Sequence, residues 1–579
     1  MRQLIKYLKH YKVQTVLAPL FKLLEASFEL LIPIIVAAII DKINVVGTGV
    51  TSAEATRYVV FACLILVALG VVGLISAVSA QYFAAKAAVG FSKELRSDMF
   101  KKMQSLSYYE MDSLGASSMI TRMTSDVNQV QTGVNLVLRL FMRSPFIVFG
   151  AMAMAFVISL TAGWVFAVTI AVLFAVVFTI MLVTIPLYKK TQAKLDKVTA
   201  ATRETLVGSR VVRAFCKEDA ESAEFARRND ALTRSQKFVG RISALMNPLT
   251  FAVINVGIIV LIHFGALRVN SGALTQGQVV ALYNYMSQIL IELIKLANLI
   301  ITVTKCFASA GRINEIFALN PSLKHGSGEK KECGAFLKFD NVSMIYSDGG
   351  ANALNKVSFT VERGETVGVI GGTGSGKSTL VNLLPHFYDA SEGEILIDGV
   401  NVNGVGDEAL RALFGIVPQR AVLFKGTIRE NIKWGNEDAT DGEIEEALSA
   451  ACATDVVASK QGGLDEQVEQ GGKNFSGGQR QRLTIARALV KKPSILILDD
   501  SSSALDYATD ARLRKNLKSL SYKPTVFLVS QRTGSIRHAD KILVLDGGNL
   551  VGCGTHEELL KTCEVYREIH FSQYGKEEA

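Results

Sequence analysis

The chain has 579 residues, of which 49% are hydrophobic and 20% are charged, with a formal net charge of +9. This length corresponds to roughly three to four ordinary domains and excludes a small disulfide-stapled scaffold, while the composition excludes collagen and low-complexity disorder. Seven cysteines occur without a Cys-x-x-Cys pair or a zinc-like spacing, which indicates reduced thiols in a cytosolic or membrane setting.

The first 305 residues contain repeated apolar segments of about 20 residues, the length that crosses a hydrocarbon core about 30 Å thick. The second and fourth segments carry no charged residue, whereas the first contains Lys22, Glu25 and Glu29. Together they predict a transmembrane domain over residues 1–320. Its six expected spans are 15–40, 58–81, 134–160, 164–188, 245–267 and 277–303.

Lys and Arg are unevenly distributed between the connections of these spans. Segments 1–14, 82–133 and 189–244 contain four, six and thirteen of them, whereas the alternate connections contain three in total. Cytoplasmic loops carry the excess of Lys and Arg. We therefore predict a multi-pass protein of the plasma membrane whose two termini and whole second half are cytoplasmic.

The two long connections of the first half are expected to be helical. No proline occurs from Tyr58 to Ser105, so one helix of about 70 Å, more than twice the bilayer core, is predicted there. Segments 107–130 and 202–225 then become turns presented to a cytoplasmic partner. A solvated helical loop is the alternative interpretation.

Charged residues inside the predicted spans need a polar environment. Lys22, Glu25 and Glu29 share one helical face, and Glu292 with Lys295 repeats this spacing in the sixth span. These faces are expected to point into the bundle or a wet cavity, either as internal ion pairs or as part of a substrate or ion path. Arg139 and Arg143, at the end of the third span, are expected to snorkel toward the interface.

A polar stretch, 321–335, is the expected linker to a second domain, 336–579, in which strands and helices alternate. Its motif GGTGSGKST follows the apolar segment ETVGVI and precedes LVNLLPHF, which fits a phosphate-binding loop between a strand and a helix. Backbone N–H groups of such a loop bind phosphate oxygens, the lysine adds charge, and the following serine ligates magnesium. The predicted phosphate-binding residues are Gly371, Gly372, Thr373, Gly374, Ser375, Gly376, Lys377, Ser378 and Thr379.

Two further motifs of this domain point to the same chemistry. The apolar strand SILILDD ends in Asp499, which is placed to hold the magnesium that bridges a nucleotide. The motif SGGQ, about twenty residues earlier, opens a helix that Ser476 can cap, and its glycines leave backbone N–H groups exposed at the positive end. This motif consists of Ser476, Gly477, Gly478 and Gln479.

In this order the motifs resemble those of ATP-binding-cassette (ABC) ATPases, and the whole chain resembles an exporter-type half-transporter of that family. The resemblance implies a helical six-span domain with long cytoplasmic helices followed by an α/β P-loop nucleotide-binding domain. It implies ATP and Mg²⁺ as cofactors. It also implies roles for Tyr346 in stacking on adenine, for Gln419 in touching magnesium, and for Asp506 at the end of the D-loop SALD.

The same resemblance implies a dimer. In this family two nucleotide domains close head to tail, so that the SGGQ motif of each covers the phosphate loop of the other. Closure moves the long cytoplasmic helices, and residues 107–116 and 202–218 would be the coupling segments.

Two positions depart from the family pattern on the side of the terminal phosphate. Asp500 stands where the family has its catalytic glutamate, and Gln531 stands where it has the switch histidine. Aspartate is shorter by about 1.5 Å, and glutamine cannot become cationic or shuttle a proton. Loss of a general base typically costs about 10²–10⁴ in rate. A smaller departure is Gln470, in place of a glutamate of the family motif.

We therefore expect ATP-driven export of a small amphipathic substrate, with this chain as the degenerate half of a heterodimer that binds ATP and hydrolyses it slowly. The expected partners are a second half-transporter with intact Glu and His, the lipid bilayer and the substrate, but no nucleic acid. An active homodimeric exporter of lipid or peptide is the main alternative. An importer, an ATP-gated channel and a soluble ABC ATPase acting on nucleic acid are the others.

Overall fold

The computed structural model describes residues 3–44, 51–323, 334–346 and 350–574. It divides into two compact units, which are 1–104 with 116–319, and 105–115 with 320–579. The short segment Ser105–Gly115 thus folds with the second unit, although its sequence neighbours belong to the first. Of the expected linker, residues 324–333 lie outside the described part of the chain.

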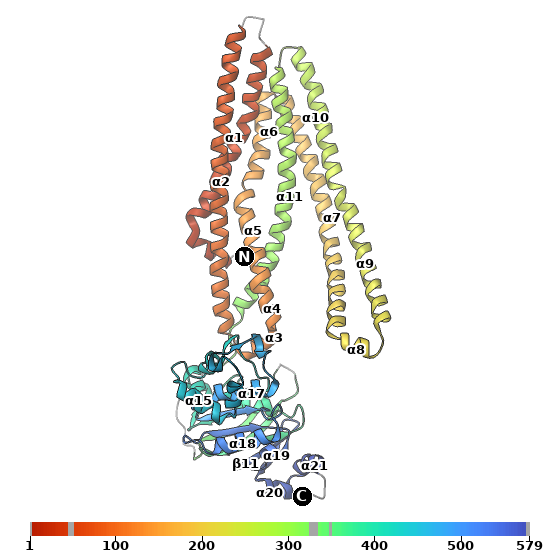
Figure 1. The fold of residues 1–579 in the computed structure, drawn as a ribbon. Coiled ribbons are helices and arrows are strands. Elements are labelled where there is room, and N and C mark those ends of the chain that lie inside the picture. Colours follow the sequence, from red (N-terminus) through yellow and green to blue (C-terminus); the bar gives the residue numbers. More distant parts are fainter. Residues whose placement is uncertain (1–2, 45–50, 324–333, 347–349, 575–579) are drawn as a thin grey trace. The chain divides into compact units, whose positions relative to one another are not determined.

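The described residues of the first unit form helices and short connections, and the unit is very elongated along its helices (Figure 1). A short 3₁₀ turn, Leu4–Tyr11, precedes α1, and a single π turn, Arg122–Asp126, separates α4 from α5. The helices are α1 Lys12–Asn44, α2 Ser52–Gln104, α4 Ala116–Thr121, α5 Val127–Leu140, α6 Arg143–Ile158, α7 Leu160–Val207, α8 Ser209–Ala214, α9 Glu218–Ala244, α10 Met246–Asn270 and α11 Gln276–Ala318.

Five helical segments of the described residues are long and apolar enough to cross a membrane. They contain the first, second, fourth and fifth predicted spans and all but the last two residues of the third. The sixth predicted span lies inside α11, which is not among these segments and carries Glu292 and Lys295 within its apolar run. That span therefore stays a prediction. The five segments are Leu4–Asn44, Ser52–Gln104, Ala116–Ile158, Leu160–Val207 and Glu218–Asn270.

The third predicted span, 134–160, contains a turn between two helices, although the segment that covers most of it is long and apolar enough to cross a membrane. Helix α5 ends at Leu140, a turn follows, and α6 begins at Arg143. The next connection is also shorter than predicted, because only Ser159, in extended conformation, separates α6 from α7. By contrast, the long proline-free segment forms the single 53-residue helix α2, as predicted.

Small residues let the helices of the first unit approach closely. Gly277, at the start of α11, lies against α1, where a Cβ atom would come within 2.1 Å of the carbonyl oxygen of Ala37. Asp41 of α1 fixes this approach, since its carboxylate accepts hydrogen bonds from Thr275 Oγ1 at 2.6 Å and from the Gly277 N–H at 2.8 Å. The contact between α1 and α11 therefore depends on the missing side chain of Gly277.

The described residues of the second unit form three sheets. A six-stranded sheet has the order β12-β11-β3-β10-β9-β6, in which only β12 runs antiparallel to its neighbour. A four-stranded antiparallel sheet has the order β2-β1-β4-β5, and β7 pairs with β8. The strands are β1 Leu337–Met344, β2 Leu354–Val361, β3 Thr366–Gly371, β4 Glu392–Ile397, β5 Val400–Asn401, β6 Phe414–Val417, β7 Gly426–Thr427, β8 Gln467–Val468, β9 Ile495–Asp499, β10 Thr525–Val529, β11 Lys541–Asp546 and β12 Asn549–Gly554.

Helices complete the second unit and bury the central strands of the six-stranded sheet. Alternate residues of β9 belong to two different cores, with Ile495 and Ile497 in one and Leu496 and Leu498 in the other. A parallel sheet covered on both faces has this property. The helices are α3 Tyr108–Leu114, α12 Lys377–Leu383, α13 Asp407–Ala412, α14 Ile428–Lys433, α15 Asp441–Ala450, α16 Thr454–Ala458, α17 Gly477–Leu489, α18 Tyr507–Lys518, α19 Thr533–Ile536, α20 His556–Thr562 and α21 Glu564–Gln573.

We predict that Gly277→Ala destabilises the first unit, because the new Cβ meets backbone of α1 rather than a flexible side chain. Overpacking of this kind costs about 1–3 kcal/mol. Thermal unfolding of the detergent-solubilised protein, followed by intrinsic fluorescence, should show a midpoint several degrees lower. The matched control is Gly73→Ala in α2, where a Cβ has no neighbour within 4 Å; equal midpoints for the two variants would contradict the prediction.

Candidate nucleotide-binding site

The site lies at the carboxyl edge of the six-stranded sheet, where four parallel strands end side by side. Strands β3, β10, β9 and β6 end at Gly371, Val529, Asp499 and Val417. Loops that follow parallel strands meet at one edge of a sheet. The residues after these ends line one cavity of about 140 Å³. They are Thr373, Gly374, Lys377, Ser378, Gln419, Asp499, Asp500, Val529, Ser530 and Gln531.

The loop between β3 and α12 has the backbone that a phosphate-binding loop requires. Gly374 and Gly376 have φ values of +80° and +97°, which L-residues with a side chain rarely adopt. Gly376 caps α12, and a Cβ there would come within 2.5 Å of the carbonyl oxygen of Ala353. Lys377 opens the helix and folds back, so that its Nζ donates to the carbonyl oxygens of Gly371 at 2.9 Å and Gly372 at 2.6 Å.

One ammonium group, of Lys377, and two carboxylates, of Asp499 and Asp500, line this cavity. Ser378 Oγ donates to Asp499 Oδ1 at 3.3 Å, and Gln419 Nε2 donates to Asp500 Oδ2 at 3.4 Å. Burial raises the pKa of Asp499 and the nearby Asp500 adds to this rise, while the Ser378 hydrogen bond opposes it. Burial lowers the pKa of the Lys377 ammonium group. The two carboxylates thus lie where a cation would relieve their repulsion, and Lys377 lies where an anion would stabilise its charge.

These donors suit Mg²⁺ bound together with phosphate. The described residues contain no group of three or more His, Cys, Asp or Glu that could enclose a metal by themselves. Mg²⁺ in nucleotide sites is typically held by one or two protein oxygens, substrate phosphates and water. Ser378 and Asp499 present such oxygens side by side.

Asp500 is held in an unusual backbone conformation. Its φ is +46°, in the left-handed region that Asp tolerates better than most residues with a side chain. Its N–H donates to the Val529 carbonyl at 3.1 Å, and its own carbonyl accepts from Ser503 Oγ at 2.8 Å. The backbone of Asp500 is therefore fixed on both sides, and only its short side chain can adjust.

Gln531 is positioned by the C-terminal helix α21, a contribution that the sequence analysis missed. Gln573 Nε2 donates to the Gln531 carbonyl at 2.7 Å, and Gln573 Oε1 accepts from the Thr533 N–H at 2.9 Å. The buried His570 of the same helix contacts Thr533 Oγ1 at 3.1 Å. No motif marks Gln573, and only its place in the fold brings it to this loop.

Tyr346 lies near the phosphate loop, beside a second aromatic residue. Its hydroxyl donates to Thr379 Oγ1 at 3.1 Å, and its ring meets that of Tyr388 edge to face, with centroids 5.2 Å apart. Tyr346 keeps 38% of its surface exposed. Its ring is thus available to a flat ligand next to α12.

The remaining predicted residues do not line this cavity. Ser476 caps α17, where its Oγ accepts from the Gln479 N–H at 3.3 Å and its own N–H donates to Gln479 Oε1 at 2.9 Å. Ser476 and Gly477 are exposed. Asp506 caps α18 by accepting from the Thr509 N–H at 2.8 Å. The SGGQ segment therefore does not line the cavity of its own chain.

Segment Ser105–Gly115, part of one predicted coupling segment, packs within the second unit. The ring of Tyr108 lies against Phe387, with centroids 4.4 Å apart. The Tyr388 hydroxyl donates to Asp112 Oδ2 at 2.7 Å, and Glu110 Oε1 accepts from the Ser322 N–H at 3.1 Å. Tyr388 thus contacts both this segment and Tyr346, although nothing in its sequence neighbourhood marks it.

The chain matches two families of conserved domains. Residues 15–293 match the ABC transporter transmembrane region, and residues 354–503 match the ABC transporter family. An uncharacterized ABC transporter ATP-binding protein of Mycobacterium tuberculosis, Rv1273c, is 34% identical over 576 residues, which are 98% of this chain and 97% of that protein. YfiB of Bacillus subtilis, described in the same words, is 33% identical over 577 residues, with 100% and 99% coverage.

A relative with a named activity and a solved structure are also similar. The ATP-dependent lipid A-core flippase of Syntrophus aciditrophicus is 32% identical over 496 residues, covering 84% of this chain and 80% of the flippase. The solved structure of a bacterial Atm1-family ABC exporter with ATP bound superimposes with a TM-score of 0.80 at 25% identity, covering 98% of this chain and 99% of the exporter.

We predict that Lys377→Met weakens ATP binding by at least about tenfold, since charge-assisted hydrogen bonds contribute about 1.5–3 kcal/mol. Equilibrium binding of radiolabelled ATP to the purified chain in the presence of Mg²⁺ measures the change. The exposed Lys561 of α20 provides the control variant Lys561→Met, which should bind ATP like the unaltered chain. Unchanged affinity in Lys377→Met would contradict the assignment of this cavity.

Proposed function

Because the chain belongs to the ABC transporters, with the transmembrane region and ATP-binding domain of their exporter-like members, we propose that it exports a small amphipathic substrate across the cytoplasmic membrane. The nucleotide shifts the transmembrane helices between two conformations by alternating access. The size of this shift is limited by the difference between the binding free energies of the nucleotide for the two conformations.

The observation that carries this proposal is the shared cavity of Lys377, Ser378 and Asp499 at the carboxyl edge of the sheet. In it the glycine loop and Lys377 would hold the phosphates of ATP, while Ser378, Asp499 and Gln419 would hold Mg²⁺. Tyr346 stacks on adenine. When bound, Mg²⁺ neutralises charge on the phosphates.

The second unit transmits its state to the helices through the covalent chain. Segment Ser105–Gly115 is anchored in the second unit by Tyr108, Glu110 and Asp112, and it continues directly from the end of α2 at Gln104. A displacement of the nucleotide domain therefore pulls on α2. This contact supports the assignment of 107–116 as a coupling segment.

The other coupling segment, 202–218, lies at the tip of the arm formed by α7 and α9 (Figure 1). Helix α8 at this tip has no buried residue, and Val207, Val211 and Phe215 are exposed to 84%, 60% and 71%. Exposed apolar residues clustered on a polar arm indicate a binding surface. We assign its occupant as the nucleotide domain of a second half-transporter.

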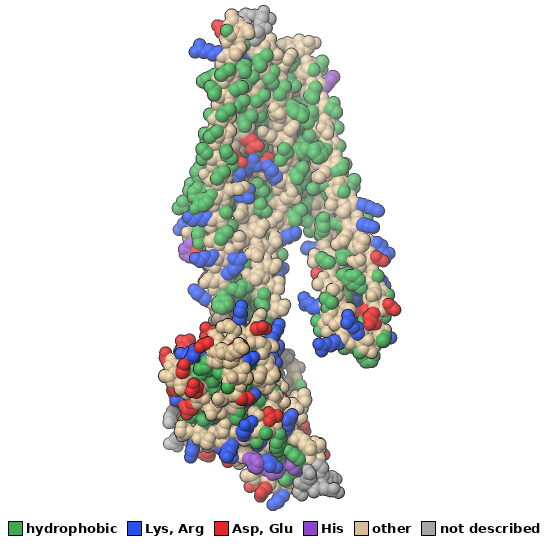
Figure 2. All heavy atoms as spheres, viewed as in Figure 1, with side chains coloured by type: hydrophobic (Ala, Val, Ile, Leu, Met, Phe, Trp, Pro, Cys, Tyr) green, Lys and Arg blue, Asp and Glu red, His purple; other side chains and the backbone are tan. Residues whose placement is uncertain are grey.

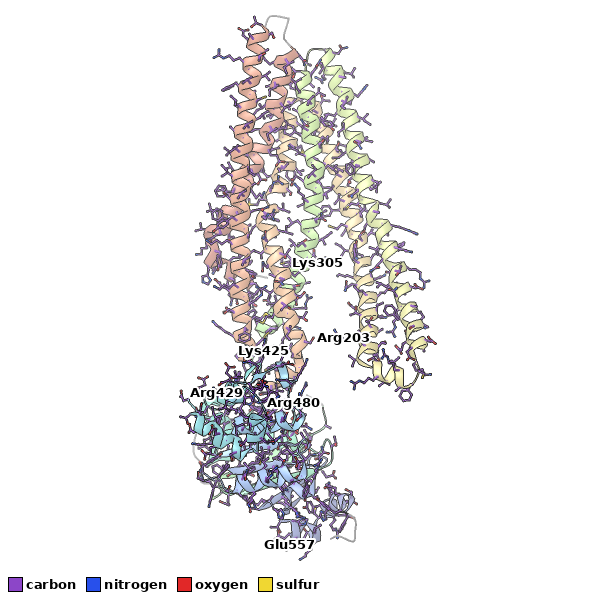
Figure 3. All side chains as sticks on the ribbon, viewed as in Figure 1. Arg203, Lys305, Lys425, Arg429, Arg480 and Glu557 are labelled. Atoms are coloured by element: carbon purple, nitrogen blue, oxygen red, sulfur yellow. The ribbon has the colours of Figure 1, made fainter. Side chains whose placement is uncertain are left out.

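Charge supports a cytoplasmic position for this arm. Hydrophobic side chains cover the first unit toward the end where α1 and α2 connect, whereas Lys and Arg gather toward the end that bears α8 (Figure 2). Arg203 of α7 and Lys305 of α11 lie in that second region (Figure 3). By the excess of positive charge on the inner side, α8, both termini and the nucleotide domain are cytoplasmic.

The site that this chain builds is suited to hold ATP more than to cleave it. Asp500 has a fixed backbone and a side chain about 1.5 Å shorter than glutamate, so it orients the attacking water poorly. Gln531 can donate a hydrogen bond to the terminal phosphate but cannot carry charge. We therefore assign slow hydrolysis to this site.

The contrast between this site and the SGGQ segment supports a heterodimer. Ser476 and the N-terminus of α17 are intact and exposed, and they do not line the cavity of their own chain. They complete the site of a partner that carries Glu and His at the positions of Asp500 and Gln531. The rival candidate is an active homodimer that exports lipid or peptide, which the similarity to a lipid A-core flippase favours.

We predict that Asp500→Glu combined with Gln531→His raises ATP hydrolysis by the purified chain alone by about 10²-fold or more, since a well-placed general base contributes 10²–10⁴. Phosphate release in nanodiscs measures the rate. The control pair Asp438→Glu and Gln461→His makes the same chemical changes at exposed positions. An unaltered chain that already hydrolyses ATP at rates typical of the family would establish the homodimer instead.

The two faces of this nucleotide domain should behave differently in the complex with the partner. Ser476→Arg blocks the partner's site, so it should abolish most ATP hydrolysis. Lys377→Met removes ATP only from the slow site, so most hydrolysis should remain. Steady-state hydrolysis by complexes purified through a tag on the partner separates the two. Equal losses in both variants would contradict the unequal division of labour.

A further inference from the structure

A cluster of six charged side chains lies inside the helical unit, between α1, α6 and α11. The central residue is Arg143, the first residue of α6, whose guanidinium contacts Glu292 Oε1 of α11 and Glu29 Oε2 of α1, each at 2.7 Å. The cluster extends to both sides, since Lys295 Nζ lies 2.8 Å from Glu292 Oε1 and Lys22 Nζ lies 2.5 Å from Glu25 Oε2. Arg143 does not snorkel toward an interface, contrary to the prediction, because these carboxylates hold it inside.

The core of this cluster is buried and internally neutral. The side chains of Arg143 and Glu292 are 8% and 3% exposed, and Ser144 Oγ donates to the second oxygen of Glu292 at 2.7 Å. Lys22, Arg143 and Lys295 balance Glu25, Glu29 and Glu292. Arg143 Nε nevertheless has no hydrogen-bond partner among the described residues. Buried polar groups left unpartnered are uncommon, so the core of the cluster is incomplete.

The cluster lies deep within the apolar part of the helices. Asn44, at the end of α1, hydrogen-bonds to Gln276, at the start of α11, at 3.0 Å. Glu29 is fifteen residues before Asn44 and Glu292 is sixteen residues after Gln276, which places both about 22–24 Å from that end of the bundle at 1.5 Å per residue. Figure 2 shows acidic and basic side chains gathered at one place on an otherwise apolar face, over α1, α6 and α11.

The helix break between α5 and α6 occurs at the same level. Arg143 is the first residue of α6, so its charge lies near the positive end of that helix, which is unfavourable in isolation. Glu29 and Glu292 offset this cost. Interrupted helices inside a membrane are tolerated where they are buried in protein or line a water-filled cavity.

Two groups of the cluster, of opposite charge, remain open to the surroundings. The side chains of Glu29 and Lys295 are 37% and 39% exposed. In the described part of the chain, Glu29 accepts a hydrogen bond only at Oε2, which leaves Oε1 free. Lys295 Nζ donates only to Glu292, which leaves two of its N–H groups free. Exposure of such charges to lipid is costly, so we expect this face to point away from lipid, toward water or a polar ligand.

We propose that this face recognises the headgroup of a zwitterionic amphipath. Glu29 binds the cationic group of the ligand, Lys295 binds its phosphate or carboxylate, and the apolar surface around them receives the hydrocarbon chain. The neutral core makes the charge complementary to a ligand without net charge. This inference deepens the proposed export function and rests on it for its physiological meaning.

The experiment measures binding of four dodecyl amphipaths to the full-length chain in lipid nanodiscs. Dodecyl phosphoethanolamine is the zwitterionic probe, and dodecyl phosphate, dodecylamine and dodecyl maltoside are the anionic, cationic and neutral ones. The unaltered chain should prefer the zwitterion. Glu29→Gln should lose about tenfold or more in affinity for the zwitterion and for dodecylamine but not for dodecyl phosphate, which is the fold-change of one charge-assisted hydrogen bond. Lys295→Gln should show the reverse pattern.

Matched controls separate recognition from loss of fold. The exposed Lys305 lies on α11 beyond Lys295, and the exposed Glu54 lies at the start of α2, so Lys305→Gln and Glu54→Gln should keep the preference of the unaltered chain. Binding of radiolabelled ATP by the same samples reports the fold. If folded Glu29→Gln and Lys295→Gln bind all four probes like the unaltered chain, the cluster is purely structural and the inference is overturned.

The outcome is independent of the proposed function. Transport of the zwitterionic probe into sealed vesicles that contain the chain and its partner tests export. Selective binding without ATP-dependent uphill transport would contradict export but support headgroup recognition. Uphill transport of amphipaths with no effect of either substitution on binding or on transport preference would support export and overturn headgroup recognition.

Discussion

The hydrogen-bond ladder that joins β3, β10, β9 and β6 in parallel is the constraint on which the nucleotide chemistry depends. Because these strands run in one direction, the loops that follow them meet, and groups more than a hundred residues apart in sequence share one cavity of about 140 Å³. Burial of the sheet on both faces makes this edge rigid. The cavity therefore holds Lys377 and Asp499 in place before any ligand arrives.

The rigid edge of the sheet also restricts the backbone of Asp500, so the length of its side chain matters for catalysis. Its backbone is held by Val529 on one side and by Ser503 on the other, in a left-handed conformation that few residues accept. A shorter side chain on a fixed backbone cannot be compensated by a shift of the chain. Gln531 is restrained in a similar way, through its carbonyl, by Gln573 of α21. In a flexible loop, by contrast, a shift of the backbone could compensate for a shorter side chain.

The helical unit contains charged side chains within an apolar environment. Arg143 is tolerated there because two carboxylates from two other helices reach it, and those carboxylates are tolerated because Arg143 and Lys295 are present. The groups at the margin of the cluster, Glu29 and Lys295, are left with unused hydrogen-bonding capacity. The same side chains thus stabilise the helix bundle and, in the proposed role, bind a polar ligand.

The sequence by itself determined the two-part architecture, the phosphate loop and the apolar spans, because apolar length and glycine spacing are local properties. The resemblance of its motifs to the ABC family also marked Asp500 and Gln531, since each stands where the family has a different residue. Only the tertiary structure decided that the third span breaks at Arg143, that Arg143 pairs with Glu29 and Glu292, and that Gln573 and Tyr388 contact the nucleotide site. These are contacts between residues distant in the chain, and no local pattern encodes which distant partner satisfies a buried charge or a free carbonyl.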